Sequence, residues 1–509
     1  MDWLKLPEPR SNIALAFKDA AGAKAWLAAQ PQAQAMHMLA AICLQVEAIE
    51  GSTLAPAQAY ELLNSLWSPA IPAENAIEPR YSRKALPLPE EDERAFDAAQ
   101  RLWLRFGIAY LRIAPDLAAD ARLRALQRAA NALRMAQYCH FNAARSCPPE
   151  IDHLLFGVLA QANAAQILEQ SVVDRDFPHL GEANISGLIV WAFLLRLADP
   201  YRLSSAQLTV ANRGLSRWRE LANFTNEPAS ESKSRLIDLS YLFGGPLPVG
   251  VPALLEVRKV RRKILQRIDA LEKGESPESL KLGRELSSYA CVRLLHLLEA
   301  SLKPGNGLVS TEVGEIELAF GAENAFAVFN GEYLNSPVAQ EKQSSAIAHQ
   351  RMAIFGFDRQ SSLPTAVKKL NVPGENWTLV DGVALRPEDR GGERRASPCL
   401  IASKLKEQPR LGVIASLQTR PDNALQAGLD WYDGRIEARF VRQSGMPGEA
   451  PARIPVFLIQ GDKEKSLLVP PQVRAATGKQ ITLEGSLTTT LTLGEVVERG
   501  VDFVRYAAS

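Results

Sequence analysis

The sequence has almost no net charge and few of the residues that usually carry chemistry. Its 58 Lys and Arg residues balance 57 Asp and Glu residues to give a net charge of +1, and only six histidines and five cysteines occur among 509 residues. No bulk electrostatic attraction therefore favours nucleic acid, an anionic membrane or acidic ligands. The cysteines are scattered and odd in number, which is typical of reduced thiols. We expect a cytoplasmic protein.

The sequence also lacks a long apolar run and a secretory signal. Its most apolar segment, Leu188–Leu195, is followed at once by Arg196. This segment is far shorter than the roughly 20 residues that a helix needs to span a bilayer. The first residues show no basic region followed by an apolar core. We therefore expect neither secretion nor membrane insertion.

Familiar catalytic motifs are missing as well. The chain has no phosphate-binding P-loop, no Gly-x-Ser-x-Gly, no His-Glu-x-x-His and no dinucleotide-binding Gly-x-Gly-x-x-Gly after a strand. Three of the histidines, His37, His140 and His296, lie inside helical apolar patterns. We expect no catalytic residues, no cofactor and no enzymatic activity.

Most of the chain before residue 304 has helical periodicity. The clearest helix follows Pro89, where acidic residues fill the first turn. Aromatic residues then recur every three or four positions along one face, at Phe96, Trp103, Phe106 and Tyr110. This spacing predicts a core-facing stripe.

Proline-rich and turn-forming segments divide this helical part into two predicted domains, 1–150 and 151–303. The proline-rich residues 68–89 are predicted to form an irregular link, and Ser204 with Gln207 predicts a capping box at a helix start. No clean 34-residue repeat occurs, so an irregular helical array is favoured over a regular solenoid.

Cys139, His140, Cys147 and His153 fall close together and raise the question of a zinc site. Their spacing matches no standard ligand pair, and two prolines separate the first three from the last. Helix packing is the favoured interpretation, with no metal bound.

The predicted helix 253–273 carries a basic face. Its exposed positions are Arg258, Lys259, Arg262 and Lys263. Such a face could meet nucleic acid or an acidic partner. No aromatic residues or phosphate-gripping loop are interleaved with it, so a solvated face is favoured and no nucleic-acid ligand is expected.

After the break at 303–307 the pattern changes from helix to strand. Residues 315–320 alternate polar and apolar side chains, as a half-buried strand does. Residues 304–376 are predicted to be a mixed linker with a strand pair, and residues 377–509 a β-rich domain. Three short apolar runs between Pro398 and Tyr432 predict an antiparallel meander.

The predicted fold class is therefore α+β. An irregular N-terminal α-helical array precedes a small C-terminal antiparallel β-barrel with flanking hairpins.

A cluster of arginines in this β-rich part is the most suggestive ligand site. Arg386, Arg390 and Arg394 are spaced four apart in a segment with two glycines, which we expect to be a flexible loop. Guanidinium groups in this arrangement can fork onto phosphate oxygens or stack on purine rings. The acidic residues interspersed among them also allow a plain charged loop, which is the favoured alternative.

Three stretches of the β-rich part, 377–381, 410–415 and 425–431, resemble the PilZ domain, a small β-barrel that is the bacterial receptor module for cyclic-di-GMP. The chain as a whole resembles long proteobacterial proteins with a helical N-terminal region and such a barrel. PilZ receptors hold the dinucleotide with an Arg-x3-Arg pair and an Asp/Asn-x-Ser-x2-Gly motif. Asp381 matches the start of the second motif, but Val383 and Arg386 stand where Ser and Gly are expected.

The first motif is altered too, because Arg351 and Arg359 lie eight positions apart. The resemblance therefore implies a degenerate barrel, with Asp381, Arg386, Arg390 and Arg394 as its candidate ligand-binding residues.

Two functions follow from the sequence. The leading hypothesis is a non-enzymatic regulatory or adaptor protein linked to cyclic-di-GMP, whose helical region engages a protein partner. The alternative is an α-helical scaffold or holdase-like protein with no nucleotide ligand.

Overall fold

A computed structural model describes residues 3–10, 12–31, 33–226, 236–303, 313–334, 372–405, 408–443, 452–461, 464–485 and 487–509. The chain divides into two compact units. The first unit contains Met1–Gly307 and Gln418–Pro421, and the second contains Leu308–Leu417 and Asp422–Ser509. Arg351 and Arg359 lie outside the described residues.

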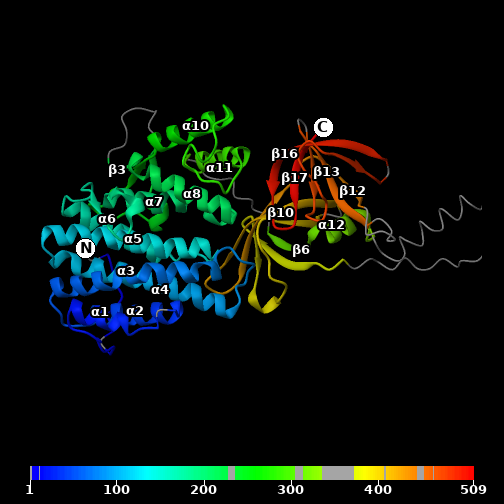
Figure 1. The fold of residues 1–509 in the computed structure, drawn as a ribbon. Coiled ribbons are helices and arrows are strands. Elements are labelled where there is room, and N and C mark those ends of the chain that lie inside the picture. Colours follow the sequence, from blue (N-terminus) through cyan, green and yellow to red (C-terminus); the bar gives the residue numbers. More distant parts are fainter. Residues whose placement is uncertain are drawn as a thin grey trace, which may run out of the picture. The chain divides into compact units, whose positions relative to one another are not determined.

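The first unit is mainly helical (Figure 1). Its helices are α1 (Ala20–Ala28), α2 (Ala35–Glu50), α3 (Pro56–Tyr81), α4 (Glu90–Ile113), α5 (Ala119–Asn142), α6 (Pro149–Ala164), α7 (Ile185–Leu197), α8 (Ser205–Trp218), α9 (Ser240–Phe243), α10 (Arg258–Glu272) and α11 (Ser288–Ser301). Two short strands, β1 (Val172–Val173) and β2 (Glu182–Ala183), pair with each other. A small sheet has the order β3 (Asn223–Thr225), β5 (Leu254–Glu256), β4 (Leu236–Asp238).

The predicted aromatic stripe forms the centre of this unit. Trp103 and Phe106 of α4 are fully buried and meet Trp67 of α3 edge to face, with ring centroids 5.4 and 5.2 Å apart. On its other side α4 packs closely on α5, because a Cβ at Gly107 would lie 2.6 Å from the side chain of Leu133. The sequence prediction of this stripe is confirmed.

The predicted link at 68–89 is wrong over most of its length. Helix α3 continues to Tyr81 with Pro69, Pro72 and Pro79 inside it. A proline in a helix interior costs about 3 kcal/mol. In α3 this cost is offset by a buried face that continues through the prolines to Ile77, so that tertiary packing overrides local propensity.

Other helix boundaries also differ from the prediction. Residues 254–256 form β5 and not a first helical turn, so α10 begins only at Arg258. The apolar pattern predicts a short helix over 236–243 and a longer one over 282–302, but 236–238 is strand β4 and α11 begins only at Ser288. Short apolar segments fit a helix or a strand equally well, and strand pairing decides between them. The capping box of Ser204 with Gln207 at the start of α8 is confirmed.

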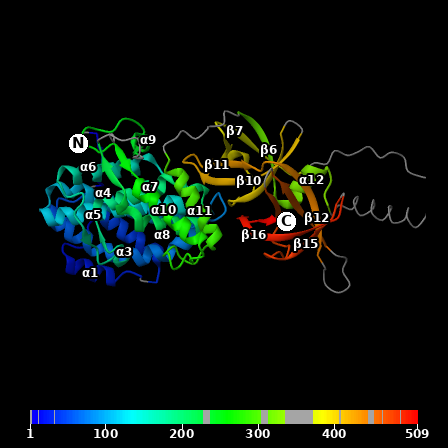
Figure 2. The same ribbon diagram turned by 90° about the horizontal axis from the view of Figure 1, so that it is seen from above.

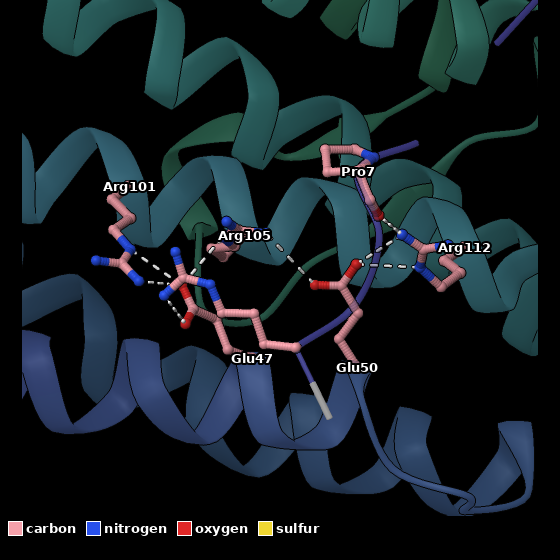
Figure 3. A network of polar contacts seen from close by, with 7 residues as sticks. Pro7, Glu47, Glu50, Arg101, Arg105 and Arg112 are labelled. Atoms are coloured by element: carbon pink, nitrogen blue, oxygen red, sulfur yellow. Dashed lines mark hydrogen bonds and ion pairs between the residues drawn. The ribbon is translucent and has the colours of Figure 1, made fainter. Parts of the chain in front are cut away.

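A polar network connects α2 to α4 (Figure 3). Glu47 and Glu50 are both on α2, and their side chains are only 1% exposed. Arg101 Nη2 and Arg105 Nε of α4 lie 2.6 and 3.1 Å from Glu47 Oε1, and Arg112 Nη2 lies 2.9 Å from Glu50 Oε1. Buried carboxylates are tolerated when guanidinium groups pair with them, so this network fixes the position of the two helices against each other.

Helix α7 is the most apolar helix of the unit. All its residues from Ile185 to Leu195 are buried in the first unit. Among the described residues, no helix combines the length and the apolar character that crossing a bilayer requires.

The second unit contains two antiparallel β structures. The first is a closed barrel with the strand order β10-β11-β8-β7-β6-β9, and α12 (Gly321–Asn330) packs against β9. Its strands are β6 (Gly314–Phe320), β7 (Glu375–Val380), β8 (Val383–Arg386), β9 (Cys399–Leu405), β10 (Gln408–Thr419) and β11 (Leu425–Trp431). In Figure 2 the labels β6, β7, β10 and β11 mark this barrel.

The second structure is a six-stranded sheet with the order β12-β13-β14-β17-β16-β15. Its strands are β12 (Arg435–Gln443), β13 (Ala452–Gln460), β14 (Lys465–Val469), β15 (Gln480–Leu483), β16 (Thr489–Arg499) and β17 (Val504–Ala508). An antiparallel bridge between Phe440 and Glu484 brings its two edge regions together. The predicted α+β class is confirmed, although the sequence did not predict β8 and β17.

Candidate functional site

The β7–β8 hairpin positions the predicted ligand residues of the barrel. Asp381 and Gly382 have φ angles of 49° and 79°, and Val380 pairs with Val383 across them. Two successive positive φ angles are typical of a type I′ turn, which an Asp-Gly pair favours. Asp381 is exposed in this turn. Arg386 ends β8 at the opposite end of the hairpin, so the structure does not bring these two residues together.

Arg386 is part of a buried ion-pair cluster. It is the last residue of β8 and only 5% exposed, and not on a flexible loop as predicted. Its Nη1 donates to Glu375 Oε2 at 2.6 Å, while Arg395 Nη2 donates to Glu375 Oε1 at the same distance. The guanidinium carbon of Arg386 lies 5.4 Å from the ring centroid of Trp377. Hydrophobic patterning places arginine on a surface, which is why the sequence did not predict this inward position.

The pKa of Glu375 reflects this cluster. Burial raises the pKa of the carboxyl group, but hydrogen bonds and positive charge from Arg395 and Arg386 more than offset burial and lower the pKa below its ordinary value. Glu375 is therefore ionised at neutral pH, and it neutralises charge that the two arginines would otherwise offer to a ligand.

Arg390 and Arg394 are more accessible. Arg390 makes a bidentate ion pair with Glu315 of β6, with N–O distances of 3.0 and 3.1 Å. The hydrogen bond from Arg390 lowers the pKa of Glu315. Arg394 is exposed and has no ion-pair partner in the part of the chain that the structure describes.

Arg390, but not Arg394, lines an open depression of the barrel with a volume of about 720 Å³. Its lining includes Arg386 and Arg390, the carboxylates of Glu315 and Glu375, and Gly391–Gly392. Two guanidinium groups therefore face two carboxylates. The depression has the arginines that bind phosphate, but it is balanced in charge.

A second cavity, which no sequence pattern indicates, lies inside the helical unit. It has a volume of about 320 Å³ and is lined by residues of α3, α4, α5, α7 and α8 and of the segment 176–179. Its buried wall contains Arg134, Trp103 and Trp191, which are 6%, 0% and 4% exposed. Asn75 and His179 at the cavity are exposed to solvent. The cavity is therefore accessible from one side.

Arg134 has an unusual environment for a buried arginine. Its guanidinium carbon lies 3.7 Å from the ring centroid of Trp191, and its Nη2 donates to Asn131 Oδ1 at 2.9 Å. Burial lowers the pKa of Arg134 to about 9, an effect that nearby Arg219 increases. No carboxylate makes an ion pair with Arg134 among the described residues, so the cavity contains a buried cation without a direct counter-ion.

Three of the four residues considered as zinc ligands contact different groups of the helical unit. Cys139 Sγ lies 3.6 Å from the Tyr81 hydroxyl oxygen, and His140 packs against Phe96 at a ring distance of 5.0 Å. The ring of His153 hydrogen-bonds to a backbone carbonyl oxygen. Burial lowers the pKa of His140 to about 3, so its imidazole is neutral.

The basic helix face also has partners in part. Of its predicted members, Arg258 lies 3.3 Å from Glu256. Arg261, which is not part of that face, is buried on the packed side of α10 and paired with Glu299 of α11. Lys259 and Arg262 remain exposed. This distribution is typical of a helix with one packed and one solvated face.

Comparison with known families concerns the helical unit. Residues 20–229 match the family model described as cyclic-di-GMP receptor FimW, N-terminal domain. All the residues that line the helical cavity lie within this segment. No curated protein and no solved structure matches the chain. The match does not extend to the barrel, so the resemblance of residues 377–431 to PilZ stays a prediction.

Proposed function

We propose that this chain is a non-enzymatic regulatory protein of cyclic-di-GMP signalling. The observation that carries the proposal is the similarity of residues 20–229 to the N-terminal domain of a cyclic-di-GMP receptor. The closed six-stranded barrel of the second unit adds support, because a small barrel is the architecture that the resemblance to PilZ implies.

In the barrel, Arg390 is the residue best placed to hold a phosphate of the dinucleotide, because it lines the depression. Arg394 does not line it, but it is exposed nearby in sequence and would be a second phosphate contact. Arg390 is exposed, and a surface ion pair such as that with Glu315 contributes little to stability. Arg390 can therefore exchange this carboxylate for a phosphate. Arg386 is buried against Glu375 and would support the site from behind. Asp381 lies at the other end of the hairpin, so any contact it makes with the ligand is separate from the phosphates.

The carboxylates imply that the site is weak. Glu315 and Glu375 would lie beside the bound phosphates, and each like-charge approach opposes binding. The same charge balance favours the second candidate function, a helical scaffold without a nucleotide ligand. In both cases the helical unit would engage a protein partner.

Isothermal titration of the full chain with cyclic-di-GMP tests the proposal, with cyclic-di-AMP as the control ligand. We expect saturable heat with the guanine dinucleotide and much weaker binding of the adenine one. No heat with cyclic-di-GMP would contradict the receptor function and leave the scaffold.

A further inference from the structure

The helical cavity contains buried donors that the protein leaves unused. The indole nitrogens of Trp103 and Trp191 are buried and have no hydrogen-bond partner among the described residues. Arg134 donates to Asn131 through Nε and Nη2, which leaves Nη1 without a partner in the same part of the chain. Leaving a buried N–H unpaired costs about 1–3 kcal/mol. A ligand with acceptor atoms would recover this cost.

The cavity also contains hydrogen-bond acceptor atoms that have no partner among the described residues. Asn212 Oδ1 is buried without a partner among the described residues. Glu78 accepts a hydrogen bond from Asn142 through Oε1 at 2.7 Å, and its Oε2 has no partner there. A suitable ligand must therefore donate hydrogen bonds as well as accept them.

The charge and shape of the cavity lining restrict the class of suitable ligands further. Glu74, Glu78 and Asp176 line the same cavity as Arg134, so a free phosphate would meet carboxylates on entry. Large planar side chains supply much of the remaining surface, with Tyr138 and Phe177 beside the two tryptophans. A volume of about 320 Å³ is at the small end of ligand pockets. These features fit an uncharged, planar heterocycle with both donors and acceptors.

We propose that the helical cavity binds a guanine base. The guanidinium edge of Arg134 would donate to O6 and N7 of the base, the pairing by which arginine recognises guanine elsewhere. Glu78 Oε2 would accept a hydrogen bond from N1–H on the adjacent Watson–Crick edge of the base, beside the 2-amino group. Adenine lacks this pattern, because it has an amino group where Arg134 needs an acceptor.

This inference rests on the proposed function and deepens it, because cyclic-di-GMP carries two guanine bases. A cavity of this size has room for one base with its ribose. The base could also come from a free guanine nucleoside or nucleotide, and the shared chemistry is the guanine ring.

The test uses guanosine, which has no phosphate and so cannot use the arginines of the barrel. Guanosine and adenosine are each titrated into the full chain while tryptophan fluorescence is followed. Because burial raises the pKa of Glu78, the titration is done at about pH 8 to keep this carboxylate ionised. We expect guanosine to quench the fluorescence to saturation and adenosine to bind at least about tenfold more weakly.

Two variants locate the binding. Glu78→Gln keeps the acceptor for Asn142 but replaces Oε2 by an amino group, so guanosine affinity falls by about tenfold or more. Trp191→Phe keeps a ring beneath Arg134 and removes the unpaired N–H, and it also weakens binding. Glu61→Gln, an exposed position on the same helix as Glu78, is the matched control and leaves affinity unchanged.

Three results would each overturn the inference. They are a failure of guanosine to bind, an equal affinity for adenosine, and folded Glu78→Gln and Trp191→Phe variants that both bind guanosine as the parent does. A parallel titration with cyclic-di-GMP keeps the two proposals distinguishable. If cyclic-di-GMP binds and guanosine does not, the proposed function stands and the guanine cavity falls. If neither binds, both fall.

Discussion

At the scale of single residues, the candidate sites depend on which charges already have a partner. Arg386 is buried and held by Glu375, whereas Arg390 is exposed and held only by a surface carboxylate. Arg134 is buried without a carboxylate partner among the described residues. A guanidinium that can leave its partner or has none is the one available to a ligand.

Replacement of Arg390 tests the barrel site. Arg390→Ala should weaken cyclic-di-GMP binding by about 1–3 kcal/mol, the loss expected for a charge-assisted contact. Arg394→Ala should act in the same direction. Arg435→Ala is a matched control, because Arg435 is also exposed and paired with a glutamate in the second unit. Unchanged affinity in both test variants would refute this placement of the phosphates.

Glu315 should oppose the ligand. Glu315→Gln removes a negative charge beside the phosphates and releases Arg390 from its bidentate ion pair, so the affinity for cyclic-di-GMP should rise. Calorimetric titration of the variant beside the parent measures the change. A decrease in affinity would mean that Glu315 supports the site and does not compete with it.

Glu74 predicts a pH dependence of stability. Burial, followed by the charge of Glu78, raises the pKa of Glu74 from 4.5 to about 7. The folded chain therefore keeps this proton between pH 4.5 and 7, where the unfolded chain has lost it, so the contribution of Glu74 to stability falls as the pH rises through this range. This change in the free energy of unfolding is about 3 kcal/mol, at about 1.4 kcal/mol per pKa unit.

Glu74→Gln should remove this term while keeping an oxygen to accept the hydrogen bond from Tyr81. Denaturant unfolding at a series of pH values measures the difference between variant and parent. We expect the variant to gain stability relative to the parent from pH 5 to 7 and to keep that gain above pH 7. A difference that does not change with pH would contradict the assignment.

At the scale of elements, buried contacts decide where helices continue. Helix α3 carries three internal prolines, yet it extends to Tyr81 because its apolar face stays buried. Helices α2 and α4 are joined by the carboxylates of Glu47 and Glu50. Both features depend on partners far away in the sequence.

The network between α2 and α4 should contribute to the stability of the helical unit. Glu47→Gln removes the buried charge that pairs with Arg101 and Arg105, and we expect a loss of about 3 kcal/mol in the free energy of unfolding. Glu90→Gln is the control, because it breaks only an exposed pair with Arg94 and should cost under about 0.5 kcal/mol. Equal losses in urea unfolding would show that the network is not stabilising.

The elements also show what could be predicted from sequence. The stripe of α4 and the alternation in β6 are local patterns, and both predictions are confirmed. The strand β8 is only four residues long and ends in an inward-facing arginine, so its pattern was too short to detect. The register of β8 against β7 and β11 is set only when the barrel closes.

The sites were harder to predict than the elements. Arg390 and Arg394 were singled out by spacing, but the paired glutamates at 315 and 375 lie on strands whose neighbours the sequence does not reveal. The helical cavity combines side chains from five helices, and Arg134 lies in an alanine- and arginine-rich helix that is typical of a solvated surface. Only tertiary packing makes this residue a buried cation.

At the scale of the whole molecule, the chain joins a helical unit similar to a receptor domain to a unit with a closed barrel. The proposed role requires the full chain to recognise a guanine dinucleotide. The two proposed sites are considered separately, with arginines proposed to hold phosphates in the barrel and donors and acceptors proposed to hold a base in the helical cavity.

Amide hydrogen exchange of the full chain with and without cyclic-di-GMP is the sharpest test of the proposed role, because it reports both whether the ligand binds and where. We expect slower exchange at 375–395 in the barrel and at the cavity-lining parts of α3 and α5. Cyclic-di-AMP should produce neither effect. Unchanged exchange throughout both units at saturating cyclic-di-GMP would refute the receptor role.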